Sequence, residues 1–267
     1  MIGVFDSGMG GLTVLAALRA ALPERDFLYL GDTARLPYGT KSPQTVVRYA
    51  LQAAELLIER GAETLVVACN TASAVALPAL RARFDGLTVC GVVEPGAAAA
   101  CAATRTGHIG VLATEGTVRG GAYPREIQRL RPDMRVSQLA CSLLVALAEE
   151  GWTSGAEPEA VTRRYLEPWF AELGTPPDVL VLGCTHFPLL ADTICTVAGP
   201  AVQVVDSAAT TAAALRERLH ARGAAHAGRS AGRIRYLATD DIERFARVGG
   251  RFLRAPLAAE DVELVEL

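Results

Sequence analysis

The chain has 267 residues and a formal net charge of −3, and 51% of its residues are hydrophobic. This length allows a substantial buried core in one large domain or in two of ordinary size. The small negative charge excludes a general attraction to nucleic acid. The first residues lack the basic and apolar segments of a signal peptide, and no long stretch is free of charged and turn-forming residues. We therefore expect a cytoplasmic protein that needs neither nucleic acid nor a membrane.

Short apolar runs alternate with longer helical patterns along nearly the whole chain. The runs are mostly continuous aliphatic and β-branched stretches, which is typical of strands buried on both faces of a parallel sheet. We expect strands at 1–5, 26–31, 64–69, 87–93, 108–113, 135–140, 178–184 and 202–206. The helix expected at 43–61 has Pro43 in its first turn and Gly61 as its stop signal. This alternation predicts an α/β fold with mostly parallel sheets.

Two places interrupt the alternation and are candidate domain boundaries. Pro95 and Gly96 break the pattern within 92–107, and a second interruption lies within 204–219. A locally basic stretch at 216–235 is predicted to be the end of a surface helix followed by a Gly/Ala loop.

Two loops rich in turn residues follow the first two expected strands. In "VFDSGMGGLTV", a dinucleotide fingerprint would need glycine where Thr13 stands, and a phosphate-binding P-loop would need a lysine. The segment still predicts a helix N-terminus that favours an anion, with Asp6 and Ser7 beside it, unless Asp6 simply caps the helix. In "GDTARLPYGTKSP", residues 37–39 form either an ordinary loop or a rigid wall beside a ligand.

Two cysteines occupy the same place in the same local pattern. In "TLVVACNTASA" and "VLVLGCTHFPL", an apolar run ends in a small residue, and Cys69 or Cys184 follows, with a threonine close behind. Ligands of open α/β sheets bind beyond the carboxyl ends of the strands, so both thiols could face one cleft. Asn70 and Thr71 follow Cys69, and His186 lies two residues beyond Cys184. A thiol near an imidazole and a helix N-terminus can ionise below its free pKa.

Three chemistries compete for these two thiols. Zinc would need two further ligands, which the spacing of the other histidines does not supply, and no CxxC pair is present. A Cys-His acyl-transfer nucleophile would leave one thiol idle. Inversion of a carbon acid needs a base on one face and a proton donor on the other, with the roles swapped in reverse. Two facing thiols supply that symmetry, so the pattern favours an epimerase or racemase. For the other cysteines we expect buried, structural, free thiols: Cys90, Cys101, Cys141 and Cys195.

On these motifs the sequence resembles the glutamate racemases of the cofactor-independent amino-acid racemase family. The motifs "GVFDSGMGGLTV", "GDTARLPYG", "VVACNTASA", "GVLATEGTVRGGAY" and "LGCTHFPLL" stand in family order and span nearly the whole chain. The resemblance implies two pseudo-symmetric α/β domains with the active site in the cleft between them. The first domain would comprise 1–93 and 207–267, and the second, inserted domain would comprise 94–206.

The resemblance also implies a function and its residues. The reaction would interconvert L- and D-glutamate for peptidoglycan synthesis. Cys69 and Cys184 would be the two acid/bases that remove and donate the substrate proton. Asp6 and His186 would assist their respective thiols, with Glu149 as a further acidic catalytic residue. The substrate would be bound by Asp6, Ser7, Tyr38, Gly39, Asn70, Thr71, Thr114, Thr117, Thr185 and His186.

No metal or cofactor is implied, and Lys41 is the only lysine that could form a Schiff base with pyridoxal phosphate. A homodimer is expected from the resemblance. The segment at 141–151 departs from the usual "CPLFVPLVEEG" and reads "CSLLVALAEEG", so Glu149 lacks the flanking prolines. The sequence shows no N-terminal extension of the kind associated with activation by a cell-wall precursor, so we do not expect that regulation. The alternatives are an aspartate racemase or related twin-cysteine isomerase, and a non-catalytic binding module.

Overall fold

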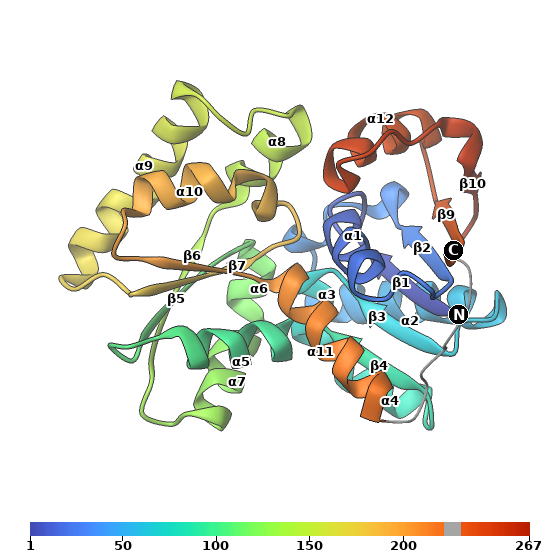
Figure 1. Cartoon of the computed structure of the whole chain (residues 1–267), viewed down its shortest axis with the longest axis horizontal. Helices are drawn as coiled ribbons and strands as arrows, with labels where there is room; N and C mark the ends of the chain where they lie inside the picture. The colour runs from blue at the N-terminus through green and yellow to red at the C-terminus, as the bar shows by residue number, and fades with distance from the viewer. Residues whose placement is uncertain (222–230) are drawn as a thin grey trace.

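The computed structural model describes residues 1–221 and 231–267 of the chain. The strands in these residues form two sheets in which every pair of neighbours runs parallel (Figure 1). The first sheet has the order β10-β9-β2-β1-β3-β4, and the second has the order β6-β5-β7-β8. The first contains β1 (Ile2–Asp6), β2 (Phe27–Gly31), β3 (Thr64–Val67), β4 (Thr88–Gly91), β9 (Ile234–Ala238) and β10 (Val262–Leu264). The second contains β5 (His108–Ala113), β6 (Arg135–Ala140), β7 (Val179–Gly183) and β8 (Gln203–Asp206).

The second sheet repeats the strand order of the first four strands in the chain. Its order, β6-β5-β7-β8, corresponds strand by strand to the order β2-β1-β3-β4 in the first sheet. In this correspondence β7 is the equivalent of β3, and Cys184 and Cys69 lie just beyond the carboxyl ends of these two strands. The two thiols therefore occupy equivalent places in the two sheets.

Helices cover both faces of each sheet (Figure 1). Successive side chains of a strand point to opposite faces, so Val4 of β1 packs with α1 and α12, whereas Phe5 packs with α2. The α-helices are α1 (Leu12–Ala21), α2 (Pro43–Glu59), α3 (Asn70–Val75), α4 (Leu77–Arg83), α5 (Val93–Ala103), α6 (Glu115–Gly120), α7 (Ala122–Leu130), α8 (Ser142–Glu150), α9 (Ala156–Leu173), α10 (Ala191–Ala198), α11 (Ser207–Ala221) and α12 (Ile242–Leu253). Short 3₁₀ helices are η1 (Thr33–Arg35), η2 (Tyr38–Thr40), η3 (Phe187–Leu190) and η4 (Ala259–Asp261).

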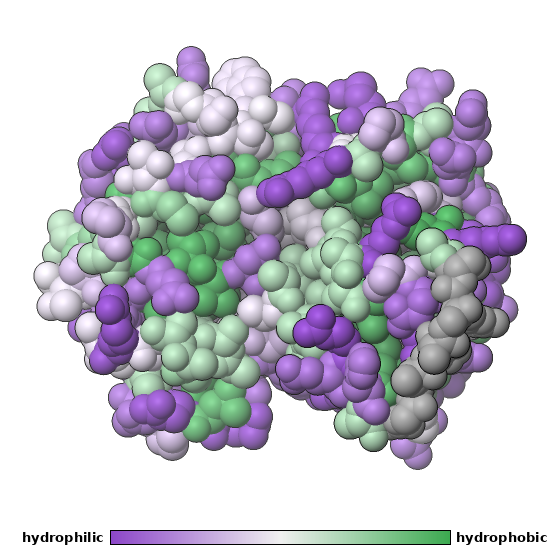
Figure 2. Space-filling model, in the orientation of Figure 1, coloured by the Kyte–Doolittle hydropathy of each residue, from purple (hydrophilic) through white to green (hydrophobic). Residues whose placement is uncertain are grey.

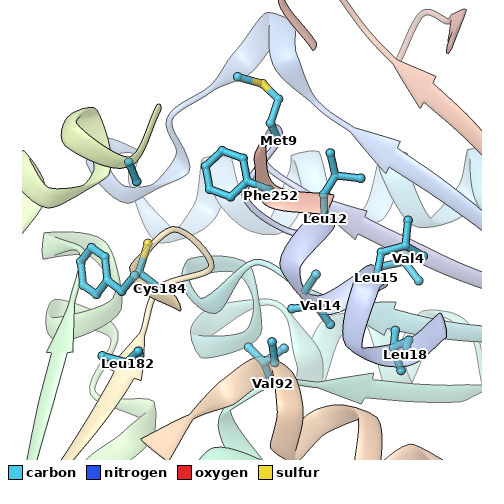
Figure 3. Packing of buried hydrophobic residues seen from close by; sticks show 14 of the residues in the cluster. Val4, Met9, Leu12, Val14, Leu15, Leu18, Val92, Leu182, Cys184 and Phe252 are labelled. Carbon is cyan, nitrogen blue, oxygen red and sulfur yellow. The ribbon is translucent and has the colours of Figure 1, made fainter. Parts of the chain in front are cut away.

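The largest cluster of buried hydrophobic side chains is continuous between the two sheets (Figure 3). It includes Val4 and Leu12 on the side of the first sheet, and Leu182 and Cys184 on the side of the second. Phe252 of α12 belongs to the same cluster and is almost completely buried. The two sheets are thus joined by a shared core as well as by the connecting chain.

The α/β class with parallel sheets is confirmed, and each strand expected from the sequence overlaps an observed strand. The structure adds β9 and β10, which the sequence analysis did not predict. The expected interruption at Pro95 and Gly96 is wrong, because α5 begins at Val93 and runs through both residues. Proline is tolerated there because the first turn of a helix needs no amide donor.

The basic stretch at 216–235 is only partly described. Its first residues are the end of α11, as expected, and its last two residues begin β9. The predicted Gly/Ala loop falls mainly on residues 222–230, which lie outside the described residues. The division into 1–93 with 207–267 and 94–206 assigns each sheet to one unit, and we propose these boundaries as the domains.

Hydrophilic and hydrophobic residues are mixed over the face seen in Figure 2, which is notched between the two halves at its lower edge. None of the described helices is long and apolar enough to cross a membrane.

Candidate active site

A cavity of about 110 Å³ lies where the carboxyl ends of the two sheets face each other. Ser7 follows β1, Cys69 follows β3, Thr114 follows β5 and Cys184 follows β7, and all four line the cavity. The predicted site residues that line it are Ser7, Tyr38, Gly39, Cys69, Asn70, Thr71, Thr114, Cys184, Thr185 and His186. The other three predicted residues lie behind this wall: Asp6, Thr117 and Glu149.

Cys69 is the N-cap residue of α3. Its sulphur accepts a hydrogen bond from the Ala72 amide at 3.5 Å and donates one to Ser7 Oγ at 3.6 Å. Burial raises the pKa of the Cys69 thiol to about 12, the charge of Asp6 adds to the rise, and the Ala72 and Ser7 contacts oppose it. In the free protein at neutral pH, Cys69 is therefore protonated. The expectation of ready ionisation was wrong for this thiol, because the motif does not reveal how completely it is buried.

Asp6 is the last residue of β1 and is fully buried. Its carboxylate accepts a hydrogen bond from the Gly8 amide at 3.0 Å, as is common for an aspartate at a turn. α1 begins with Gly11 as its N-cap and has no side-chain cap, so Asp6 braces the preceding turn and does not cap the helix. Burial raises the pKa of Asp6, although the charge of His186 and the amides of Gly11 and Gly8 lower it.

His186 lies beside Cys184, with its Nδ1 3.8 Å from the Cys184 sulphur and 3.3 Å from Thr185 Oγ1. The imidazole packs against the ring of Phe252 in a T-shaped arrangement, with 5.0 Å between the ring centroids and 74° between the ring planes. Burial alone would lower the pKa of His186, but hydrogen bonds with Cys184 and Glu149 and the charges of Cys184 and Asp6 raise it to about 10. The imidazole therefore carries a positive charge at neutral pH.

Glu149 contacts the far side of the same imidazole. Its Oε1 is 3.1 Å from His186 Nε2, and its Oε2 accepts a hydrogen bond from the Arg244 guanidinium at 2.8 Å. Burial would raise the pKa of Glu149, but the hydrogen bonds and charges of His186 and Arg244 lower it below its usual value. The divergent segment at 142–150 nevertheless forms α8, which carries Glu149 to this place without the prolines.

Three threonine hydroxyl groups form a closed triangle, and two of these threonines line the cavity. Thr71 Oγ1 lies 2.9 Å from Thr114 Oγ1 and 3.1 Å from Thr117 Oγ1, and the latter two are 3.0 Å apart. Thr117 is fully buried and does not reach the cavity, so it can only orient the other two hydroxyl groups. Thr71 comes from α3 and the other two from the segment after β5, so the triangle joins the two halves of the chain.

Tyr38 and Gly39 form part of the wall, as one of the two sequence interpretations of residues 37–39 predicted. The Tyr38 hydroxyl donates a hydrogen bond to the buried carboxylate of Asp32, which also accepts one from Arg35 Nε at 2.7 Å. A Cβ atom at Gly39 would come within 2.8 Å of Thr114 Cβ. The absence of a side chain therefore allows the loop to pack directly on the second half of the site.

The structure adds wall residues that the sequence analysis did not name as site residues: Pro37, Thr40, Ser142 and Val145. Ser142 stands where the family pattern has proline, so the departure from that pattern reaches the cavity wall. Cys195 is exposed and Cys101 is only partly buried, which corrects the expectation that both are buried. Within the described residues, no group of three or more His, Cys, Asp or Glu side chains is arranged to hold a metal ion.

Residues 8–215 match the Asp/Glu/Hydantoin racemase family. The chain belongs to this family. Among curated racemases, the glutamate racemase of Geobacter metallireducens is 48% identical over 266 residues, which cover 100% of this chain and 96% of that protein.

Two solved glutamate racemase structures share the fold over nearly their whole length. The glutamate racemase RacE1 of Bacillus anthracis has a TM-score of 0.93 at 34% identity, and the match covers 100% of this chain and 97% of that one. The glutamate racemase of Francisella tularensis, solved in complex with D-glutamate, has a TM-score of 0.90 at 33% identity, covering 99% and 97%. The family resemblance inferred from the sequence motifs is therefore confirmed.

Proposed function

We propose that this chain interconverts L- and D-glutamate, with Cys69 and Cys184 as the paired acid and base. The observation that carries the proposal is that two thiols at equivalent strand ends of two repeated sheets line one cavity. The activity is that of a glutamate racemase, an isomerase, and full-length relatives with that name support it. Its product, D-glutamate, serves peptidoglycan synthesis and so contributes to the cell wall.

In the proposed reaction, one cysteine thiolate removes the proton from the α-carbon of glutamate. The electron pair left on that carbon is delocalised into the adjacent carboxylate, and the thiol on the opposite side donates its proton to the other face. L-Glutamate needs Cys184 as the base and Cys69 as the acid, and D-glutamate needs the reverse. The raised pKa of Cys69 keeps this thiol protonated in the free protein, which is the form that a proton donor needs.

The polar wall offers groups suited to both carboxylates and the ammonium group of glutamate. We assign substrate binding to the hydroxyl groups of Ser7, Tyr38, Thr71, Thr114 and Thr185, to the Asn70 amide and to the Gly39 backbone, with Thr117 behind them. In this scheme Asp6 assists Cys69 through its charge, His186 assists Cys184, and Glu149 acts through His186.

We also propose that the protein works as a homodimer in the cytoplasm and that it needs no cofactor. Light scattering of the purified protein tests the dimer. Lys41→Arg tests the absence of pyridoxal phosphate, since the proposed reaction should proceed without that lysine and without added cofactor.

The test of the two-base assignment is exchange of the α-hydrogen in heavy water, measured separately for each enantiomer. Cys69→Ser and Cys184→Ser should each abolish racemisation, because a serine hydroxyl is a far poorer base at neutral pH. Any residual exchange should remain on D-glutamate in Cys184→Ser and on L-glutamate in Cys69→Ser. Identical loss or retention for both enantiomers in both variants would replace the two-base scheme with a single-base one.

The same assay separates the alternatives. Aspartate racemisation faster than glutamate racemisation, measured side by side by circular dichroism, would favour the aspartate racemase. Binding of glutamate without loss of its optical activity would favour the non-catalytic binding module.

A further inference from the structure

Behind Cys184, three side chains extend from the cavity to the opposite half of the protein. The Cys184 sulphur is 3.8 Å from His186 Nδ1, His186 Nε2 is 3.1 Å from Glu149 Oε1, and Glu149 Oε2 is 2.8 Å from an Arg244 nitrogen. Each carboxylate oxygen of Glu149 thus has its own charged partner. Exposure rises along the series, from 9% for the His186 side chain to 17% for Glu149 and 35% for Arg244.

Cys184, His186 and Glu149 lie in the half that contains the second sheet, whereas Arg244 lies in the half that contains the first. Cys184 and His186 follow β7, and Glu149 lies on α8, whereas Arg244 lies on α12 after β9 (Figure 1). Arg244 is also fixed through its backbone, because its amide donates a hydrogen bond to the side chain of Asp241, the N-cap of α12, at 3.0 Å. The guanidinium therefore reaches Glu149 from a rigid helix end in the other half of the molecule.

A guanidinium at one oxygen fixes both the charge and the rotation of a carboxylate. Fixing Glu149 in turn fixes the imidazole of His186, because Oε1 can accept from Nε2 only in one ring orientation. That orientation directs Nδ1 at the Cys184 sulphur. Without Arg244, a partly buried Glu149 would lose its second charged partner and could turn toward solvent.

We propose that Arg244 is a positioning residue for Cys184 and has no comparable influence on Cys69. This inference rests on the proposed function. The contacts around Cys69 come from Ser7 and Ala72, with Asp6 nearby, and none of these residues hydrogen bonds to Arg244. Because Arg244 lies on α12, in the half that contains the first sheet, the alignment of Cys184 depends on the two halves being in contact.

A comparison of racemisation rates in the two directions cannot reveal an effect that is confined to Cys184. The two enantiomers are equal in free energy in water, so kcat/KM must be the same in both directions for every variant. The experiment therefore isolates each thiol and measures exchange of the α-hydrogen in heavy water. In Cys69→Ser, where only Cys184 remains, adding Arg244→Gln should slow exchange of L-glutamate on the order of tenfold. In Cys184→Ser, where only Cys69 remains, adding Arg244→Gln should leave exchange of D-glutamate within about twofold.

Three further variants distinguish positioning from a general effect on α12. Arg244→Lys should retain part of the L-glutamate exchange, because it keeps the charge but not the planar fork. Arg247→Gln removes an exposed arginine from the same helix and should change neither exchange rate. Arg251→Gln removes a hydrogen bond of 2.6 Å to the Glu149 backbone oxygen but leaves its carboxylate untouched, so it should have little effect. An Arg251→Gln effect as large as that of Arg244→Gln would mean helix docking and would overturn the inference.

Isotope effects on the intact two-thiol protein provide a second measurement if single-thiol exchange is too slow to quantify. If Arg244→Gln slows only the Cys184 step, the kcat/KM isotope effect of α-deuterated L-glutamate should rise and that of α-deuterated D-glutamate should fall. Equal changes for both enantiomers, or none, would refute the positioning role. Absence of any exchange or racemisation by the unmodified protein would refute the proposed function itself, so the two failures are distinguishable.

Discussion

The hydroxyl group of Tyr123 donates a hydrogen bond to Asn70 Oδ1 at 2.8 Å, and both side chains are buried. Because Oδ1 is engaged as an acceptor, the Asn70 amide can turn only its NH₂ group toward the cavity that it lines. That nitrogen has no hydrogen-bond partner among the described residues. The contact with Tyr123 of α7 thus leaves the Asn70 NH₂ group as the donor that this residue offers to an anionic substrate.

We expect Tyr123→Phe to raise KM for both glutamate enantiomers about fivefold, which corresponds to about 1 kcal/mol for one hydrogen bond. The substitution leaves the ring in the core but allows the amide to rotate. kcat should change less than KM, because the thiols are untouched. Tyr236→Phe, on the distant strand β9, is the control. Unchanged KM values in Tyr123→Phe would show that Asn70 does not bind the substrate through its NH₂ group.

The cysteines should react with iodoacetamide in an order set by exposure. Cys195 is exposed, so it should be labelled first at pH 7.5, with no loss of activity. Cys69 should react slowly, and its rate should grow about tenfold per pH unit up to pH 9, because its raised pKa leaves little thiolate. Glutamate should protect Cys69 and Cys184. Mass spectrometry that found Cys69 labelled before Cys195 at neutral pH would show that the thiol is ionised in the free protein.

The contribution of His186 to the free energy of unfolding should decrease as the pH rises. Its pKa is raised from 6.5 to about 10, so its partners contribute fully below pH 6.5 and the contribution is lost as the pH rises through about 10. His186→Gln should therefore be most destabilising near pH 6 and progressively less so toward pH 10, as measured by urea unfolding. His108, whose pKa is lowered by burial and by Arg135, should show the opposite trend. A His186→Gln deficit that stayed constant with pH would contradict the raised pKa.

Gly10 should not tolerate a side chain. A Cβ atom there would lie 2.4 Å from His186 Nδ1 and 2.4 Å from Thr185 Oγ1. Gly10→Ala should therefore displace His186, destabilise the fold by about 1–3 kcal/mol and reduce activity. Gly8→Ala is the matched control two residues away, because its nearest neighbour is Leu36 Cδ2 at an ordinary 3.4 Å. Equal activity of the two variants would mean that His186 can shift without consequence.

Most strands were predicted from continuous apolar runs, as in β7, where all five residues are buried and leave a continuous trace in the sequence. β9 alternates half-buried and exposed residues at its start, and β10 is only three residues long, so neither produced a clear signal. The helix at Pro95 was missed because a proline is compatible with the first turn of a helix as well as with a break.

In the candidate site, too, local sequence patterns revealed some residues and missed others. The strand-end motifs led to Cys69 and Cys184 because each motif is a local arrangement of a strand end and a following turn. Arg244 could not be found in this way, since it meets Glu149 across 95 positions of sequence and from a different sheet. Contacts of that kind depend on how the two halves pack, which no local pattern records. The roles of the site residues stay predictions until the exchange experiments are done.

The pairing of β2 with β9 joins residues 27–31 to residues 234–238. All strands of the second sheet lie between these segments, at residues 108–206. During synthesis the second sheet can pair completely while one edge of β2 is still open, because its partner has not yet been made. An open edge offers unpaired backbone groups to other chains, and a contact across about 200 residues is slow to close. The edge of β2 therefore stays open to other chains from the synthesis of β2 until that of β9.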